Sequence, residues 1–305
     1  MKQITAAIAV LCATLLMLGG CGKAEVPRAP LGGGETGSVS AGAAAKDSSH
    51  MEHWSVDSRS LGKTMKVNVY VPKSYSGSEP YPVLYVLHGK NGNENSFFAN
   101  GLDIGRKMDK LAAAGKIKPM LIVSPQLDNS YGVNSADQVQ EKKEYRLGRY
   151  EDYVMQDLIP AIDADYNTVK SREGRFIGGI SMGGYAALHL AFVYPDKFSR
   201  VGGHSAAVWK ETPSYLAWLY EGGISQDEVD PVRLAAKGNA DRLQIYLDHG
   251  QSEHAAIAEG NDALKAVLDR QGVPYQFHTG QGGHNNKYWA AHIEDYLLFY
   301  GADGK

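Results

Sequence analysis

Short runs of β-favouring residues alternate with longer helical patterns along most of the chain. The candidate strands are rich in Val, Ile, Leu and Tyr and cover 65–71, 82–87, 120–124, 175–178, 200–203, 243–248 and 275–278. Helical periodicity is expected over 104–114, 150–165, 183–194, 214–220, 255–271 and 287–300. This alternation predicts an α/β fold, with a mostly parallel sheet and helices on both faces. Ligands bind such sheets at the carboxyl ends of the strands, so the residues just after each strand are the first candidates for a site.

The first candidate strands differ in their hydrophobic pattern. MKVNVYV at 65–71 alternates polar and apolar residues, which is typical of a half-exposed edge strand. The next two, 82–87 and 120–124, are almost continuously apolar, as buried parallel strands are. We therefore expect the first strand at an edge of the sheet and the next two inside it.

The N-terminus has the pattern of an export signal. Lys2 precedes an apolar run from Ile4 to Leu18, which has the length of a signal-peptide core and is too short for a stable membrane span. The run ends in LGGC at 18–21, which resembles the bacterial lipobox, in which the cysteine is diacylated. Residues 1–21 are therefore predicted to be a lipoprotein signal peptide, with an ordinary signal and a fortuitous Cys21 as the alternative. An exported protein, lipid-anchored to the bacterial cell envelope, is expected.

The rest of the chain divides into a tether and one domain. Residues 22–51 are rich in Gly, Ala and Ser without apolar periodicity, which predicts a flexible tether. Residues 52–305 are numerous enough for one large α/β domain. The two cysteines are Cys12 and Cys21, so disulfides, zinc–cysteine sites and cysteine nucleophiles are not expected in that domain. A net charge of -3 gives no electrostatic case for binding nucleic acid, and the membrane is expected to be contacted only through the lipid.

Ser181 is the candidate nucleophile, in the stretch FIGGISMGGY at 176–185. It follows a predicted strand and precedes a predicted helix, which is the context that a G-x-S-x-G nucleophile elbow requires. Gly179 and Gly183 leave room around the serine in a strained turn, and the helix N-terminus favours developing negative charge. Ser205, in the similar stretch GHSAA, lacks the second glycine and is expected to lie at a strand end beside the site.

A serine nucleophile needs a base and a carboxylate that orients it. His284, in the glycine-rich stretch GQGGHNNKYW before the last helix, has the position that the order Ser, acid, His gives to the base. The alternatives for the base are His204, His249, His254 and His292. LQIYLDHGQSEHA offers two acids, Asp248 at the predicted strand end and Glu253 in the next loop. Either can hold the base in the right tautomer, so the residues alone leave this choice open.

The oxyanion that forms during acyl transfer needs two N–H donors. One is expected from Met182, directly after the nucleophile, and the second from the loop that follows the strand 82–87. In that loop His88 and Gly89 make the turn, and the backbone N–H of Lys90 is the expected donor. The ring of His88 is interpreted as structural, holding segments of the loop together.

These motifs together resemble the family of α/β hydrolases that includes esterase D (S-formylglutathione hydrolase), feruloyl and acetylxylan esterases, siderophore trilactone esterases and bacterial mycolyltransferases. The resemblance covers the whole of 52–305 through MKVNVYVPKSY, YPVLYVLHGKNGNENSF, RYEDYVMQDLIPAIDADY, GRFIGGISMGGYAALHLAFVYPDKFSRVGGHSA, IYLDHGQSE and GGHNNKYW. It implies the α/β-hydrolase fold. Family members carry G-x-x-D/E after this strand, which implies Glu253 over Asp248 and likewise implies Lys90 and Met182 as oxyanion donors. Glutamate in place of the commoner aspartate is a departure that keeps Asp248 as the second choice.

The resemblance implies a serine carboxylic ester hydrolase that works through an acyl-enzyme and needs no metal or organic cofactor. Expected substrates are small acyl or aryl esters, including carbohydrate-linked ones. The alternatives are an acyltransferase similar to the mycolyltransferases and a non-catalytic binding lipoprotein; the oligomeric state is not indicated. Segments 126–148 and 206–237 are expected to overhang the site, and the second carries aromatic side chains that either line a substrate pocket or pack a surface helix: Trp209, Tyr215, Trp218 and Tyr220.

Overall fold

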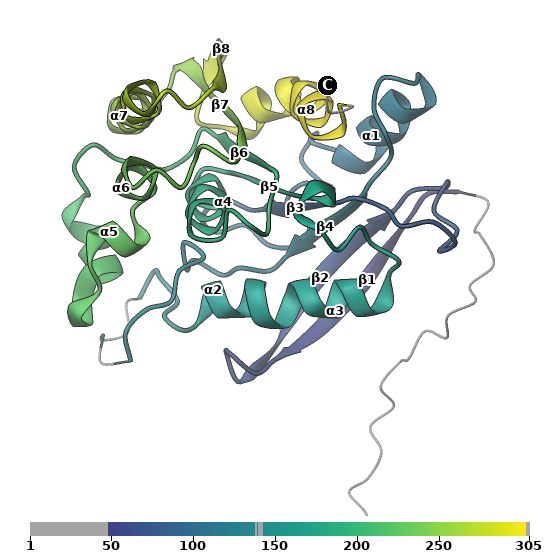
Figure 1. The fold of residues 1–305 in the computed structure, drawn as a ribbon, viewed down its shortest axis with the longest axis horizontal. Helices are drawn as coiled ribbons and strands as arrows, with labels where there is room; N and C mark the ends of the chain where they lie inside the picture. The colour runs from purple at the N-terminus through teal and green to yellow at the C-terminus, as the bar shows by residue number, and fades with distance from the viewer. Residues whose placement is uncertain (1–47, 138, 140–142, 303–305) are drawn as a thin grey trace, which may run out of the picture. The chain divides into compact units, whose positions relative to one another are not determined.

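The computed structural model describes residues 48–137, 139 and 143–302. The predicted signal peptide, Cys21 and most of the predicted tether lie outside these residues. The described strands form one sheet in the order β1-β2-β4-β3-β5-β6-β7-β8 (Figure 1). Their bounds are β1 (His50–Ser58), β2 (Lys63–Val71), β3 (Val83–Leu87), β4 (Leu121–Pro125), β5 (Arg175–Ile180), β6 (Arg200–His204), β7 (Gln244–Ser252) and β8 (Tyr275–Gly283). β1, β2 and β4 pair antiparallel and β4, β3 and β5 to β8 pair parallel, so the predicted mostly parallel sheet is confirmed.

Helices cover both faces of the sheet, as the alternation predicts. Side chains of β3 alternate between the faces: Val83, Tyr85 and Leu87 join one hydrophobic cluster, and Leu84 and Val86 join the other. The second cluster includes residues of α1 (Ile104–Ala113) and α8 (Asn286–Gly301). The first includes residues of most other helical segments: α2 (Tyr150–Asp152), a π-helical turn (Tyr153–Leu158), α3 (Ile159–Asp165), α4 (Met182–Val193), a 3₁₀ segment (Ser214–Gly223), α5 (Gln226–Val229), α6 (Pro231–Ala236) and α7 (Ala255–Gln271). A short 3₁₀ turn (Arg172–Gly174) precedes β5.

Strand β1 was not predicted, and it displaces β2 from the edge. β1 pairs with the whole of β2, from His50 opposite Val71 to Ser58 opposite Lys63. It begins two residues before the predicted domain start at residue 52. Its sequence HMEHWSVDS is largely polar, which suits an outer strand that has one unpaired edge but hides the strand from a hydrophobicity pattern. The prediction of β2 as an edge strand is therefore wrong.

Strands β7 and β8 extend further than their hydrophobic runs. Their pairing continues past Asp248 and His278 through Gly250 opposite Gly280 to Ser252 opposite Gly283, with an irregularity in register after Gly250. The glycines permit this close approach, since a Cβ on Gly250 would lie 2.2 Å from the carbonyl oxygen of Gly282. The extension places Glu253 directly after β7 and His284 directly after β8.

The described residues include neither a membrane-spanning helix nor a cluster suited to a metal. Every helix among them is too short or too polar to cross a bilayer. In the same part of the chain, His, Cys, Asp and Glu side chains nowhere gather in a group of three or more that could hold a metal ion.

Candidate active site

Ser181 occupies the turn between β5 and α4. Its backbone has φ 56° and ψ -118°, a conformation that costs a non-glycine residue about 1–3 kcal/mol and persists only when its surroundings fix it. The N–H of Ser181 donates to the carbonyl of His204 at 2.9 Å, and its carbonyl accepts from the N–H of Ala207 at 2.9 Å. The end of β6 and the residues after it therefore hold the serine at the end of β5.

The glycines around Ser181 are required by contacts with backbone atoms. A Cβ on Gly183 would lie 1.9 Å from the carbonyl oxygen of Leu87, and one on Gly179 would lie 2.3 Å from the backbone of Gly183. On the other side of the turn, the Cβ position of Gly89 is 3.4 Å from the Cβ of Ser181. The loop after β3 thus lies directly against the serine.

His284 and Glu253 extend a line of polar contacts from Ser181. The Ser181 Oγ lies 2.7 Å from Nε2 of His284, and Nδ1 of His284 lies 2.9 Å from Oε1 of Glu253. The contact between Nδ1 and Oε1 has an ion-pair distance without the alignment of a hydrogen bond. An ionised carboxylate beside Nδ1 favours the proton on that nitrogen, which leaves Nε2 to accept from the serine hydroxyl. The imidazole packs edge-to-face against Trp289, with ring centroids 5.1 Å apart. Three predicted site residues are therefore brought together in the order that proton transfer requires.

The Glu253 carboxylate is buried but kept charged. Burial alone would raise its pKa, but the hydrogen bond and charge of His284, the N–H of His254 and the hydroxyl of Ser205 outweigh burial and hold the pKa of Glu253 below its ordinary value. The N–H of His254 lies 2.8 Å from Oε1. The carboxylate can therefore orient His284 and stabilise a positive charge on it.

Asp248, the second choice for the acid, faces a different histidine. Its Oδ1 lies 2.9 Å from Nδ1 of His204, and its Oδ2 accepts from the hydroxyls of Tyr288 and Tyr296, both at 2.8 Å. Asp248 and His204 have side chains only 1% and 2% exposed. Asp248 thus joins β6, β7 and α8 beneath the site.

The other candidates for the nucleophile and base also have separate partners. Ser205 is buried, and its Oγ accepts from Nε1 of Trp289 at 3.1 Å. Nδ1 of His249 contacts the carbonyl of Gly250, and His292 pairs with Asp295. The ring of His254 is exposed, with its centroid 5.6 Å from that of His284. Trp289 was not singled out from the sequence, although its place in the helix that follows His284 is a signal that could have found it.

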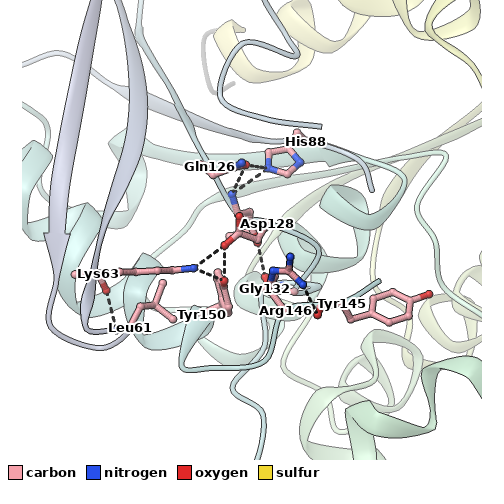
Figure 2. Close-up of polar contacts among 12 residues, drawn as sticks. Leu61, Lys63, His88, Gln126, Asp128, Gly132, Tyr145, Arg146 and Tyr150 are labelled. Atoms are coloured by element: carbon pink, nitrogen blue, oxygen red, sulfur yellow. Dashed lines mark hydrogen bonds and ion pairs between the residues drawn. The ribbon is translucent and has the colours of Figure 1, made fainter. Parts of the chain in front are cut away.

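The two expected oxyanion donors belong to the segments next to Ser181, namely the start of α4 and the loop after β3. Met182 is the first residue of α4, so its N–H has no acceptor within the helix and lies at the positive end of the helix dipole. Lys90 follows Gly89, which contacts the serine. The ring of His88 is buried between loop segments, and its Nδ1 lies 2.8 Å from the carbonyl of Gly89. Its Nε2 accepts the N–H of Leu127 at 2.9 Å and lies 2.7 Å from Oε1 of Gln126 (Figure 2). Burial lowers the pKa of His88, in agreement with a neutral ring.

The aromatic side chains that follow β6 differ in how far they are buried. Trp218 is 1% exposed and its ring lies 5.4 Å from that of Tyr145, while Trp209 is buried beside Tyr131 at 5.9 Å. Tyr215, in contrast, is 59% exposed. Packing therefore accounts for Trp218, whereas Tyr215 is exposed to solvent.

A mostly parallel sheet with a strained serine elbow and a histidine after the last strand defines an α/β hydrolase. The sequence profile of the family described as "Putative esterase" matches residues 58–300, and the chain belongs to that family.

It is 33% identical over 150 residues to an endo-1,4-beta-xylanase/feruloyl esterase of Xylanibacter ruminicola, a match that covers 48% of this chain and 20% of that protein. It is 27% identical over 257 residues to esterase MT1326 of Mycobacterium tuberculosis, which covers 73% of this chain and 53% of that protein. The chain thus spans about half or less of the length of these two relatives.

Solved structures share the fold at lower sequence identity. A ferulic acid esterase superposes with a TM-score of 0.71 at 24% identity, covering 84% of this chain and 99% of that one. An S-formylglutathione hydrolase from Staphylococcus aureus gives a TM-score of 0.66 at 22% identity, covering 82% and 99%. These likenesses support the α/β-hydrolase architecture over nearly the whole of the described residues.

Proposed function

We propose that this protein is a serine carboxylic ester hydrolase that works through an acyl-enzyme. The observation that carries the proposal is the line from Ser181 Oγ to His284 Nε2 at 2.7 Å and from His284 Nδ1 to Glu253 Oε1 at 2.9 Å. It lies at the carboxyl ends of parallel strands, where α/β enzymes bind their ligands. Membership of an esterase family supports the same reaction class.

Each step of acyl transfer is assigned to a residue of the proposed site. Ser181 Oγ attacks the ester carbonyl while Nε2 of His284 takes its proton, and Glu253 stabilises the resulting imidazolium. The N–H groups of Lys90 and Met182 receive the tetrahedral oxyanion, each contributing about 3 kcal/mol in comparable sites. The oxyanion collapses and the ester C–O bond breaks, with the alcohol taking the proton from His284. Water, deprotonated by His284, then attacks the acyl-enzyme, and His284 returns that proton to the Ser181 oxygen as the C–O bond to serine breaks and the acid leaves.

The proposed substrates are small acyl or aryl esters, including esters carried by carbohydrate. The names of the Xylanibacter relative and of the ferulic acid esterase support an aromatic acyl group. The exposed ring of Tyr215 supports it too, since an aromatic substrate can stack on such a ring.

The test is an ester panel run on the full chain in mild detergent, beside Ser181→Ala. The panel holds acetyl, butyryl and feruloyl aryl esters, acetylated xylan and a siderophore lactone. We expect the wild type to hydrolyse short-chain aryl esters and the variant to lose that activity. Equal activity in the two proteins would refute the proposal. A sugar acceptor is added in a parallel arm, where transfer products in excess of free acid would reassign the protein as an acyltransferase.

We also propose that the protein is exported and lipid-anchored through Cys21. The support is the sequence LGGC at 18–21 after a short apolar run. In a bacterial host, Cys21→Ser is expected to move the protein from the membrane fraction to the soluble extract and to abolish labelling by an alkyne fatty acid. Unchanged fractionation and labelling would exclude an anchor at this cysteine.

A further inference from the structure

The loop that carries Lys90 is held in place by side chains from a distant segment. The peptide unit between Gly89 and Lys90 is planar and trans, so its C=O and N–H point in opposite directions. The carbonyl of Gly89 accepts from Nδ1 of His88 at 2.8 Å and from the N–H of Gly92 at 3.0 Å. Fixing that carbonyl fixes the direction of the Lys90 N–H.

The next peptide unit, between Lys90 and Asn91, is held by Asn129. Oδ1 of Asn129 accepts the N–H of Asn91 at 2.7 Å, and its Nδ2 donates to Oδ1 of Asn91 at 2.9 Å. Nδ2 also donates to the carbonyl of Glu144 at 2.8 Å. Asn91 has φ 63°, in the left-handed region, where a residue stays only if other contacts compensate. Both peptide units on either side of the Lys90 Cα are therefore restrained, one by His88 and Gly92 and the other by Asn129.

Asn129 is itself tied to the antiparallel side of the sheet through Asp128. Oδ2 of Asp128 receives Nζ of Lys63 at 2.7 Å and the hydroxyl of Tyr150 at 2.5 Å (Figure 2). These contacts link β2 and α2 to the segment that follows β4. The side chain of Lys90 makes two more contacts between the loop and this segment. Its Nζ lies 2.6 Å from Oε2 of Glu144 and over the ring of Tyr145.

We propose that Asn129 is a positioning residue for the oxyanion hole and acts through Asn91 on the Lys90 N–H. Its side chain bonds the loop rather than the reacting atoms, so its effect is to preorganise a donor that is used fully only in the transition state. An oxyanion donor is worth about 10²- to 10³-fold in kcat when it is removed, and misplacing one costs part of that factor. This inference rests on the proposed function, because it assigns a role in ester hydrolysis.

The test compares Asn129→Ala and Asn129→Leu with Asn93→Ala in the full chain. Asn93 is an exposed asparagine of the same loop that accepts the N–H of Asn95, so it is the matched control. We expect kcat on an aryl acetate to fall about tenfold to hundredfold in both Asn129 variants, with KM changed less than about threefold. Asn93→Ala is expected to match the wild type. The leucine variant keeps the branched shape and the number of side-chain heavy atoms, so it reports on the lost hydrogen bonds if the alanine variant folds poorly.

A second readout separates positioning from a general structural role. An aryl boronic acid adds to a catalytic serine and places an oxygen where the oxyanion forms, so its affinity reports on the hole. We expect that affinity to fall by the same factor as kcat, with the melting temperature of at least one Asn129 variant near that of the wild type. Unchanged kcat in a folded Asn129 variant, a loss confined to KM, or an equal loss in Asn93→Ala would overturn the inference. A wild type without esterase activity would instead overturn the proposed function.

Discussion

Two pairs of a carboxylate and a histidine lie on or directly after neighbouring strands. Each pair joins the same two chemical groups at the same distance. Glu253 and His284 are separated by 2.9 Å, and so are Asp248 and His204. The pairs differ in what the second imidazole nitrogen faces. Nε2 of His284 meets the hydroxyl of Ser181, and the His284 side chain is 16% exposed, whereas Nε2 of His204 meets the phenol of Tyr300 in the core. A buried acid–histidine pair is thus no sign of catalysis by itself, and access to a nucleophile and to substrate separates the two.

The largest expected effect is on turnover when the acid of the exposed pair is removed. Glu253→Ala leaves His284 without the group that orients it and stabilises its charge. We expect kcat/KM of the folded variant to fall by about 10³- to 10⁴-fold, as for other triad acids. Steady-state kinetics on an aryl acetate measures this. A loss smaller in Glu253→Ala than in Asp248→Asn would exchange the roles of the two acids.

The buried pair is expected to show its effect in stability. Asp248→Asn removes the charge of a carboxylate that accepts from His204, Tyr288 and Tyr296, and it turns one of the two acceptor oxygens into an NH2 group that faces a core donor. We expect the free energy of unfolding to fall by about 3–5 kcal/mol, which urea denaturation measures. The folded fraction is expected to retain kcat within about tenfold of the wild type. Wild-type stability in this variant would contradict the structural role.

The pH dependence of stability sharpens the comparison at Glu253. Its folded-state pKa lies below the ordinary value of 4.5, because His284, His254 and Ser205 outweigh the opposing effect of burial. The stabilisation by this carboxylate is therefore complete above about pH 4.5 and is lost as the pH falls through the lower folded-state pKa. We expect Glu253→Gln to be less stable than the wild type at neutral pH, with a gap that narrows as the pH falls below about 4.5. A gap that widens in acid would show that the carboxylate is not stabilised in the folded protein.

The smallest expected effect belongs to Ser205, which lies between the two pairs. Its hydroxyl accepts from Trp289, and it helps to hold the pKa of Glu253 low. Ser205→Ala removes the acceptor of Trp289, whose ring packs against His284, and one of the groups that lower the pKa of Glu253, so kcat is expected to fall by up to about tenfold. A loss as large as that of Ser181→Ala would make Ser205 the nucleophile instead.

The comparison also shows what the sequence could and could not predict. The strand and helix pattern predicted the sheet and most helices, because buried parallel strands and helix faces leave periodic hydrophobic signals. The choice between Asp248 and Glu253 stayed open, since the hydrophobic run of β7 ends at Asp248 while the strand continues to Ser252. The residues DHGQS look like a turn, and only their pairing with the glycines of β8 makes them a strand. Strand β1 gave no such signal because its sequence is largely polar. The contact between Asn129 and Asn91 gave none either, because two polar side chains 38 positions apart in the sequence leave no periodicity.

The most direct test of the central claim is the site of covalent labelling. A fluorophosphonate reacts with a serine activated by a histidine, and peptide mass spectrometry locates the adduct. The arrangement of Ser181, His284 and Glu253 predicts one adduct on Ser181 in the wild type and in Asp248→Asn, and much slower labelling in Glu253→Ala. An adduct on Ser205, or labelling that persists in Ser181→Ala, would contradict the account.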